Sequence, residues 1–396
     1  MKKYLLYILI LTMSSSLFSC EDDLEIMSEA SLSATAPLAE EDVNKLLTGL
    51  YQRMMEPSGY AYFNILAPGL LADNFKPVKF QWFQVQYMYE HKVPADDILL
   101  SYQYKDYYTG ISRANTIITV PTATEDQIGK AKFCRALNYM RLYDLYERVP
   151  LVDETYDNTE IAPSSKQDVL NFIIADLIDA QAKMNPMDLT DVATNQTVPT
   201  KEAATALLAR MYRLNGELAK AGEQAESLIK AGNFTLAANP LERTNEVIMR
   251  FAGNKAEENG SWGWIMSPAA KTWNCFAAAD DLVALLDADD TRRILFDIEG
   301  KDANEGYVYS KKYRTNDDSD LLISRIAEMY LISAEAGNAN RLTELQAVRK
   351  SSLSLENERR LEMSFEWTRW QDLKLAGETY RFPYPQGAVD ANPLLK

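Results

Sequence analysis

The segment TEDQIGKAKFCRALNYMRLYDLY (Thr124–Tyr146) begins the part of the chain that decides its fold. Its first four residues form a capping box, in which the Thr124 hydroxyl and the Gln127 amide satisfy unpaired N–H groups at a helix start. Ser164-Ser-Lys-Gln167 predicts a second helix start, and Pro199-Thr200 precedes a third. A fourth helix is predicted to end at Ala231-Gly232, because glycine is the usual residue after a helix C-terminus. This block is therefore predicted to form two helix pairs.

A short pattern, Ala-x-x-Tyr, occurs in three predicted helices, at Ala136–Tyr139, Ala209–Tyr212 and Ala327–Tyr330. A small residue lets a paired helix approach closely, and the tyrosine fills the groove that this approach creates. Ala221 and Ala225 follow the middle copy, where a tetratricopeptide-type hairpin has small residues. The copies are too widely spaced for an array of about 34-residue repeats. The predicted fold is mainly α, a tetratricopeptide-like scaffold of helical hairpins that carries insertions.

Apolar residues at helical spacing predict further helices outside this block. They span Val43–Met54, Ile98–Val120, Leu322–Ala336 and Glu356–Ala376. A capping box at Thr343–Gln346 predicts the start of a short helix between the last two.

The remaining segments look irregular. Short strands are predicted at Glu246–Phe251, Arg293–Ile298 and Tyr307–Tyr313, and a loop or short strand at Phe80–Tyr89. One domain is therefore expected over residues 41–396, with the helical scaffold at about 41–231 and 321–380 and a loop and short-strand insertion at about 232–320.

Residues 1–19 are predicted to be a lipoprotein signal peptide, because two lysines precede an apolar run too short to span a bilayer. Leu17-Phe-Ser-Cys20 resembles a bacterial lipobox, so Cys20 is expected to be lipidated. The alternative is an ordinary secretory signal with an incidental cysteine. Glu21-Asp-Asp23 resembles the signal that sends lipoproteins of Bacteroidota-type bacteria to the outer face of the outer membrane. Residues 20–40 are expected to be a flexible tether.

The composition is that of a folded globular protein. The 396 residues are 47% hydrophobic and 25% charged, and the formal net charge is −16. Such an acidic chain lacks the basic footprint that phosphate binding needs, so nucleic acid is not expected as a partner.

Catalysis is not expected either. His91 is the only histidine, and no nucleophile-elbow motif lies near it. Carboxylates that a glycosidase could use are numerous but show no readable geometry, namely Asp280, Asp281, Asp289, Asp290 and Asp317–Asp320. Asp302–Gly306 has only part of a calcium loop, and motifs for cofactors are missing, so neither a metal nor a cofactor is predicted. Cys134 lies in a helical apolar pattern and is predicted to be buried.

Aromatic residues in the irregular segments are the best candidates for ligand contact. An indole face can lie against the apolar face of a sugar ring while amides bond its hydroxyls. The candidates are Trp262, Trp264 and Trp273 in the insertion, and Trp82 and Tyr87 in the earlier glutamine-rich run. Alternatively, these tryptophans fix the loops to the scaffold. Trp367 and Trp370 are instead predicted to be core residues.

Several motifs together resemble the SusD/RagB family of outer-membrane nutrient-binding lipoproteins. In order, they are Ala131–Tyr146 with Val149-Pro-Leu151, Ala162–Ser165 with Ile174–Leu177, Pro199–Ala204 with Leu208–Tyr212, and Glu358-Arg-Arg360 with Trp370–Leu373 and Gly377. The chain departs from the family at Glu147-Arg148 and at Trp367-Thr368, where the family usually has a glycine. It is also short between Ala336 and Glu356.

This resemblance implies a protein that captures oligosaccharides outside the cell and passes them to a SusC-like TonB-dependent outer-membrane barrel. Peptide capture, as in RagB-like relatives, is the alternative within the family. A structural partner of the transporter without its own ligand site is a third possibility.

Overall fold

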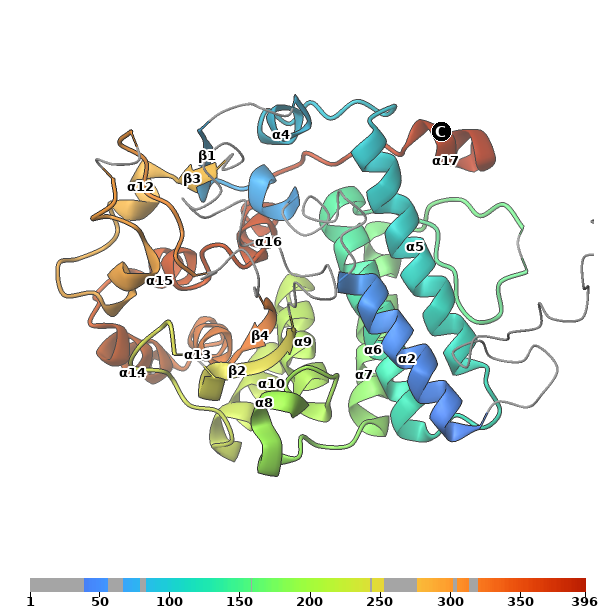
Figure 1. Ribbon diagram of the computed structural model, residues 1–396, viewed down its shortest axis with the longest axis horizontal. Coiled ribbons are helices and arrows are strands. Elements are labelled where there is room, and N and C mark those ends of the chain that lie inside the picture. The colour runs from blue at the N-terminus through green and yellow to red at the C-terminus, as the bar shows by residue number, and fades with distance from the viewer. Residues whose placement is uncertain are drawn as a thin grey trace, which may run out of the picture.

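A computed structural model describes residues 39–55, 67–78, 83–157, 159–242, 244–252, 276–301, 305–312 and 320–396. Figure 1 shows a mainly helical molecule with a few short strands. None of the helices in these ranges is long and apolar enough to cross a bilayer. Cys20 and the predicted ligand residues Trp82, Trp262, Trp264 and Trp273 lie outside the described residues.

The helices of the scaffold pack one against the next along the chain. They are α2 (Glu40–Met55), α5 (Ile98–Ile118), α6 (Glu125–Tyr146), α7 (Lys166–Lys183), α9 (Lys201–Leu214), α10 (Leu218–Ala231), α13 (Ile326–Glu335) and α14 (Ala339–Arg349). α5 packs on α6, α6 on α7, α7 on α9, α9 on α10, α10 on α13 and α13 on α14, while α2 covers α5 and α6 (Figure 1). The predicted scaffold of helical hairpins is confirmed.

Each Ala-x-x-Tyr copy lies in the first helix of a pair, in α6, α9 and α13. Ala136, Ala209 and Ala327 are fully buried, as close helix contact requires. The chain between α10 and α13 therefore separates the second of these hairpins from the third.

Most of the predicted helix ends are confirmed by their hydrogen bonds. Gln127 Oε1 accepts the Thr124 N–H at 2.9 Å and Thr124 caps the Gln127 N–H in return. Thr200 caps α9, and Gly232 ends α10 with φ of 72°. Two capping boxes were wrong, because Ser165 rather than Ser164 caps α7, and Thr343 lies inside α14.

Three other predictions fail because tertiary contacts override the local pattern. Residues 80–89 contain helix α4 (Phe83–Tyr89), which buries Val85 and Met88 three residues apart. The predicted helix at Leu322–Ala336 begins as strand β4 (Leu321–Arg325) before α13. The helix predicted at Glu356–Ala376 is two helices, α15 (Leu355–Glu362) and α16 (Thr368–Leu375).

Two short antiparallel sheets join the insertion to the scaffold. Strand β1 (Phe75–Pro77) pairs with β3 (Phe276–Ala278), and β2 (Val247–Phe251) pairs with β4 through an irregular register. The strand predicted at Glu246–Phe251 is confirmed as β2. The strand predicted at Arg293–Ile298 is largely a 3-10 helix, η5 (Thr291–Leu295), and only Phe296 forms an isolated bridge, with Ser310.

Short elements complete the described chain. They are η1 (Leu189–Asp191), α8 (Val192–Asn195), η2 (Thr244–Glu246), α12 (Asp280–Val283), α17 (Gln386–Ala391) and η6 (Pro393–Leu395). The last two lie beside the start of α5 in Figure 1.

A buried charge network, made of Glu246, Lys312, Arg325, Glu362 and Glu366, holds the turn between α15 and α16. Arg325 of β4 donates to both oxygens of Glu366 at 2.7 to 3.0 Å, and also pairs with Glu362 and Glu246. Lys312 forms an ion pair with Glu366 and donates to the Ser364 carbonyl at 2.9 Å. The network ties the insertion and β4 to the last helices.

Both departures from the family pattern fall where the backbone has positive φ. Glu147 has φ of 61° after α6, and Trp367 has φ of 74° before α16. Glycine adopts such angles most easily, and the resemblance implies a glycine at both places. In this chain Trp367 is buried beneath the Arg141 guanidinium, 4.5 Å from its ring centre. Trp370 is also buried, which confirms that both tryptophans are core residues.

Candidate functional site

Tyr87 is the predicted ligand residue that the structure describes. It lies half-buried on α4, edge-on to Phe83 at a ring-centre distance of 5.6 Å. Phe83 is 58% exposed and Tyr89 is 40% exposed. Helix α4, at the top of Figure 1, therefore carries two exposed aromatic side chains.

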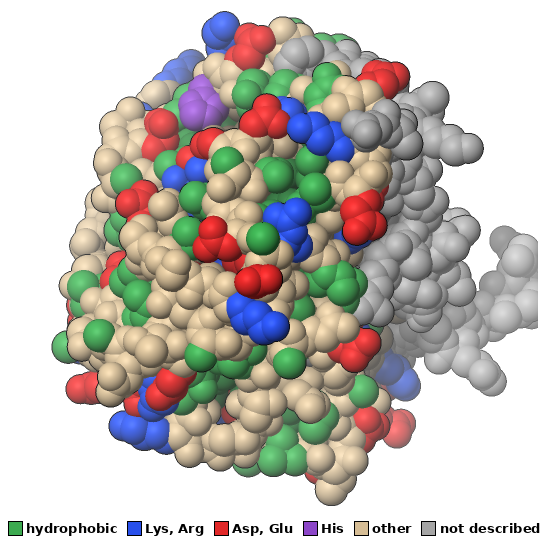
Figure 2. Space-filling view, turned by 90° about the vertical axis from the view of Figure 1, so that its left-hand side faces the viewer, with side chains coloured by type: hydrophobic (Ala, Val, Ile, Leu, Met, Phe, Trp, Pro, Cys, Tyr) green, Lys and Arg blue, Asp and Glu red, His purple; other side chains and the backbone are tan. Residues whose placement is uncertain are grey.

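The lone histidine has a structural environment. His91 Nε2 lies 2.9 Å from the Leu71 carbonyl oxygen, and the ring stacks on Tyr380 at 4.6 Å. Cys134 is fully buried, and burial raises the pKa of its thiol. Within the described ranges, no three His, Cys, Asp or Glu side chains are placed to hold a metal ion. Acidic and basic side chains are interspersed over the face shown in Figure 2.

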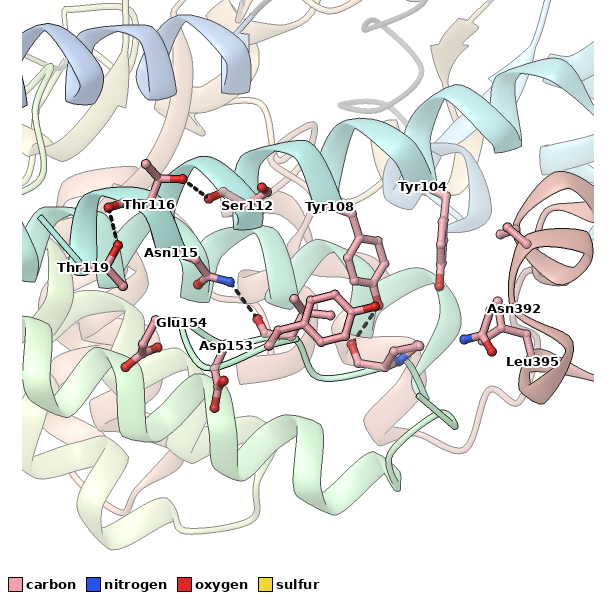
Figure 3. Close-up of a pocket in the computed structure, with 15 residues that line it drawn as sticks. Tyr104, Tyr108, Ser112, Asn115, Thr116, Thr119, Asp153, Glu154, Asn392 and Leu395 are labelled. Atoms are coloured by element: carbon pink, nitrogen blue, oxygen red, sulfur yellow. Dashed lines mark hydrogen bonds between the residues drawn. The ribbon is translucent and has the colours of Figure 1, made fainter. Parts of the chain in front are cut away.

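A pocket of about 540 Å³ lies between α5, the loop after α6 and the C-terminal segment (Figure 3). Helix α5 contributes Tyr104, Tyr108, Ser112, Asn115, Thr116 and Thr119; the loop contributes Pro150, Val152, Asp153, Glu154 and Tyr156; and the C-terminal segment contributes Ala388, Ala391, Asn392 and Leu395. The volume is in the range of small-molecule sites.

The α5 wall follows from helical spacing. Tyr104, Tyr108, Ser112, Asn115 and Thr119 are three or four residues apart, so they share one face of the helix. Figure 3 shows both tyrosines extending from α5 towards the loop. Asp97 fixes the start of this helix by accepting two backbone N–H groups, those of Leu99 and Leu100.

The loop wall is fixed by a buried tyrosine of α6. Tyr139 accepts the Val152 N–H at 2.6 Å and donates to the carbonyl oxygen of the same residue at 3.1 Å. From α5, Tyr108 donates to the Pro150 carbonyl at 2.8 Å, and Asn115 donates to the Val152 carbonyl at 3.2 Å. The loop is therefore bound to two helices of the scaffold.

The third wall is formed by η6 and α17. Asn392 donates from Nδ2 to the Ile161 carbonyl at 2.8 Å, and Tyr384 donates to the Arg148 carbonyl at 2.5 Å. The Gln386 N–H bonds the Ala95 carbonyl at 2.8 Å. These three bonds hold the C-terminal segment against both other walls.

Two carboxylates give the pocket its charge. A hydrogen bond from the Thr155 side chain lowers the pKa of Asp153. Burial alone would raise the pKa of Glu154, but the hydrogen bond from Arg135 brings it below its usual value. Both groups are therefore ionised at neutral pH, and the lining residues include no Lys, Arg or His in the described part of the chain.

This arrangement can hold a polar ring. Tyrosine faces suit the apolar C–H groups of a sugar, and hydroxyl, amide and carboxylate oxygens suit its hydroxyls. The sequence analysis did not identify this pocket, because its walls come from three distant segments. The polar stripe beside the apolar stripe of α5 was the one local signal.

Comparisons with known proteins agree on one family. Residues 22–213 match a SusD-like family model described as "Starch-binding associating with outer membrane". The chain is 26% identical over 240 residues to SusD-like protein P38 of Formosa agariphila, which covers 58% of this chain and 46% of P38. It is 26% identical over 391 residues to SusD-like protein P2 of the same organism, covering 75% of this chain and 76% of P2. This chain thus spans less than half of P38 but about three quarters of P2.

Solved structures share the fold at lower identity. A laminarin binding SusD-like protein superimposes with a TM-score of 0.75 and 17% identity, covering 89% of this chain and 98% of that one. Surface glycan-binding protein A from Bacteroides uniformis gives a TM-score of 0.76 and 18% identity, covering 90% and 99%.

Proposed function

Because this chain belongs to the SusD-like family, we propose that it captures oligosaccharides at the cell surface and passes them to a TonB-dependent outer-membrane transporter. The observation that carries the ligand assignment is the pocket with tyrosine walls, whose size and oxygen-rich lining suit a sugar residue. The laminarin binding and surface glycan-binding proteins that share its fold support a saccharide as the ligand.

Surface attachment follows from the N-terminal segment. Lipidation of Cys20 would anchor the protein to the outer membrane, and the acidic residues after it would direct it to the outer face. The proposed role is binding, and the lone histidine is used structurally, through its contacts with Leu71 and Tyr380.

The aromatic residues predicted from the sequence belong to the proposal as a second platform. Tyr87 on α4 and the predicted residues Trp82, Trp262, Trp264 and Trp273 would stack against an extended chain of sugars. A ligand longer than one residue could use such a platform in addition to the pocket.

The test begins with copurification from detergent-solubilised outer membrane, with identification of the transporter and of any bound ligand. Isothermal titration of the purified protein with saccharide and peptide libraries then separates the ligand classes. We expect saccharide binding that weakens when Trp262, Trp264 and Trp273 are changed to Ala. Peptide binding alone would support the RagB-like alternative, and a transporter complex without a ligand would support a purely structural role.

A further inference from the structure

We infer that the pocket between α5, the 150–156 loop and the C-terminal segment accepts neutral or amine-bearing sugar residues and rejects acidic ones. The inference rests on the proposed function, because it specifies the class of saccharide that the pocket takes. It follows from the hydrogen-bonding state and charge of the lining side chains.

Four hydroxyl groups of the pocket already donate to protein carbonyls. The Tyr108 hydroxyl donates to the Pro150 carbonyl at 2.8 Å, and the Tyr156 hydroxyl donates to the Thr159 carbonyl at 2.9 Å. A hydroxyl has a single hydrogen, so each of these oxygens is left only with acceptor lone pairs for a ligand.

The hydroxyls of Thr116 and Thr119 on α5 are in the same state. Thr116 donates to the Ser112 carbonyl at 3.0 Å, and Thr119 donates to the Thr116 carbonyl at 2.9 Å (Figure 3). Asn115 and Asn392 each use one Nδ2 hydrogen to bond a backbone carbonyl, at 3.2 and 2.8 Å, and each keeps a second for a ligand. Asn115 Oδ1 already accepts from Arg135, and Asn392 Oδ1 from the Leu394 N–H. With the four bonded hydroxyls and the Asp153 and Glu154 carboxylates counted against these two amide hydrogens, the lining side chains offer more acceptors than donors.

The carboxylates extend this imbalance to charge. Asp153 Oδ1 accepts from the Thr155 N–H at 2.9 Å and from its hydroxyl at 2.7 Å, and a carboxylate has capacity for further donors. Glu154 lies 2.5 Å from Arg135 Nη1. That arginine is buried and is already bound at both Nε and Nη2, at 2.7 Å, by Asp176. The positive charge of Arg135 is thus shared between Asp176 and Glu154, and the net charge of these groups together with Asp153 is negative.

Sugar chemistry decides what fits such a site. A sugar hydroxyl or a protonated amine can donate to the free acceptors, and a cation is also attracted to tyrosine faces. A carboxylate or sulfate on a sugar only accepts, so it would find few donors and would meet two like charges. Specificity here would arise from repulsion of the wrong class as well as attraction of the right one.

The experiment is isothermal titration of the full-length lipoprotein, purified in detergent, with three probes of equal length. The probes are laminarin, glucosamine and galacturonate oligosaccharides, which are neutral, cationic and anionic. We expect the galacturonate probe to bind at least about tenfold more weakly than the other two at low salt. This difference in affinity should become smaller as the salt concentration increases, because salt screens the repulsion.

Two variants connect this preference to the pocket. Asp153→Asn retains an acceptor for Thr155 but supplies a donor and removes a charge. It should therefore reduce the affinity ratio between the other two probes and the galacturonate probe by about fivefold. Asp157→Asn is the matched control on the same loop, since Asp157 caps Thr159 and does not line the pocket. It should leave the preference unchanged.

A blocking variant separates the two proposals. Thr116→Trp fills the pocket from an exposed position on α5, and it should abolish the discrimination between probes. If the galacturonate probe binds as tightly as the neutral one and Thr116→Trp removes that binding, the charge preference is overturned while the saccharide site stands. If Thr116→Trp alters the binding of none of the three probes, the pocket is not the saccharide site and the charge preference fails with it, while capture by the aromatic platform is tested separately by the tryptophan variants. If none of the three probes binds the unmodified protein at all, the saccharide assignment itself fails.

Discussion

The hydroxyl of Tyr139 lies 2.6 Å from the backbone nitrogen of Val152 and accepts its hydrogen bond. Tyr139 belongs to the first Ala-x-x-Tyr copy, which packs α6 within the helical scaffold, while Val152 lies in the wall of the pocket. The residue that organises a helix pair therefore also positions the ligand-binding loop. Scaffold and candidate site are joined through one side chain.

Replacing Tyr139 with Phe should weaken the attachment of this loop, while the aromatic ring continues to fill its place in the core. The Val152 N–H would lose its partner, while the Val152 carbonyl would keep the bond from Asn115, at a cost of about 1–2 kcal/mol in the free energy of unfolding. Saccharide affinity should fall as well, because the loop carries Asp153 and Glu154. Urea unfolding and hydrogen exchange of the Val152 amide measure the two effects. Tyr212→Phe, at the same motif position in α9 but away from the pocket, should leave affinity unchanged; an equal loss there would contradict the assignment.

Close packing of α5 on α6 requires a glycine at position 110. A methyl group at Gly110 would lie 2.7 Å from Asn138 Nδ2, and that side chain is buried and bonded to the Cys134 carbonyl. Gly110→Ala should therefore destabilise the protein by about 1–3 kcal/mol and displace the α5 wall of the pocket. Thermal unfolding and saccharide titration are the measurements.

Gly49→Ala is the matched control for that substitution. A methyl group there meets no atom within 4 Å, and alanine favours the helix, so a gain of about 0.5–1 kcal/mol is expected. A loss of stability in both variants would show that the Asn138 contact is not the cause.

How much of this could be read from the sequence depends on whether the signal was local. The capping box at Thr124 and the glycine at 232 act within one helix turn, so the helix ends were predicted correctly. The break between α15 and α16 was missed, because the sequence has no glycine or proline there and Trp367 adopts positive φ instead. What maintains this turn is the contact of Glu366 with Arg325, 41 residues earlier in the chain.

The same reasoning explains the outcome at the candidate site. Tryptophan in a glycine-rich segment is a local signal, and it led to residues 262, 264 and 273, which lie outside the described ranges. The pocket instead depends on the meeting of residues near 104, 153 and 392, a juxtaposition that only the fold creates. No spacing rule links such distant segments.

Substitution of Arg325 should lower the free energy of unfolding more than most other substitutions. Replacing it with Met would remove the cation that contacts Glu246, Glu362 and Glu366 together. Three buried carboxylates would then share Arg349 and Lys312, which should cost about 3–5 kcal/mol or prevent folding. Arg250→Met is the control on the neighbouring strand β2, where the pair with Asp320 is partly exposed and should contribute less than about 1 kcal/mol. Denaturant unfolding of both variants gives the comparison, and similar losses would contradict this role for the network.

The network should also make the protein sensitive to strong acid. Burial alone would raise the pKa of Glu366, but the charges of Arg325 and Lys312 outweigh it and bring the pKa to about 2. A pKa below its unfolded value means that this group stabilises the fold above about pH 4.5. That contribution is lost as the pH falls towards 2. Unfolding free energies between pH 7 and pH 2 should show a steep decline that Glu366→Gln makes shallower, from a lower starting stability; an unchanged slope would contradict the prediction.

Ionisation of Asp144 in α6 should instead lower the free energy of unfolding as the pH rises through the mildly acidic range. Burial raises its pKa to about 6, although Arg141 and the Gln371 amide, at 2.9 Å, favour the ionised form. A raised pKa in the folded state means that the contribution of this group is fully present below about pH 3.8 and is lost as the pH rises through 6. At about 1.4 kcal/mol per pKa unit, the loss approaches about 3 kcal/mol.

Asp144→Asn cannot titrate but can still accept from Gln371, so its stability relative to the unmodified protein should rise between pH 4 and pH 7. Denaturant unfolding at a series of pH values measures this difference, and Asp157→Asn, an exposed control, should show no such trend. A difference between Asp144→Asn and the unmodified protein that stays constant across this range would mean that Asp144 does not titrate there.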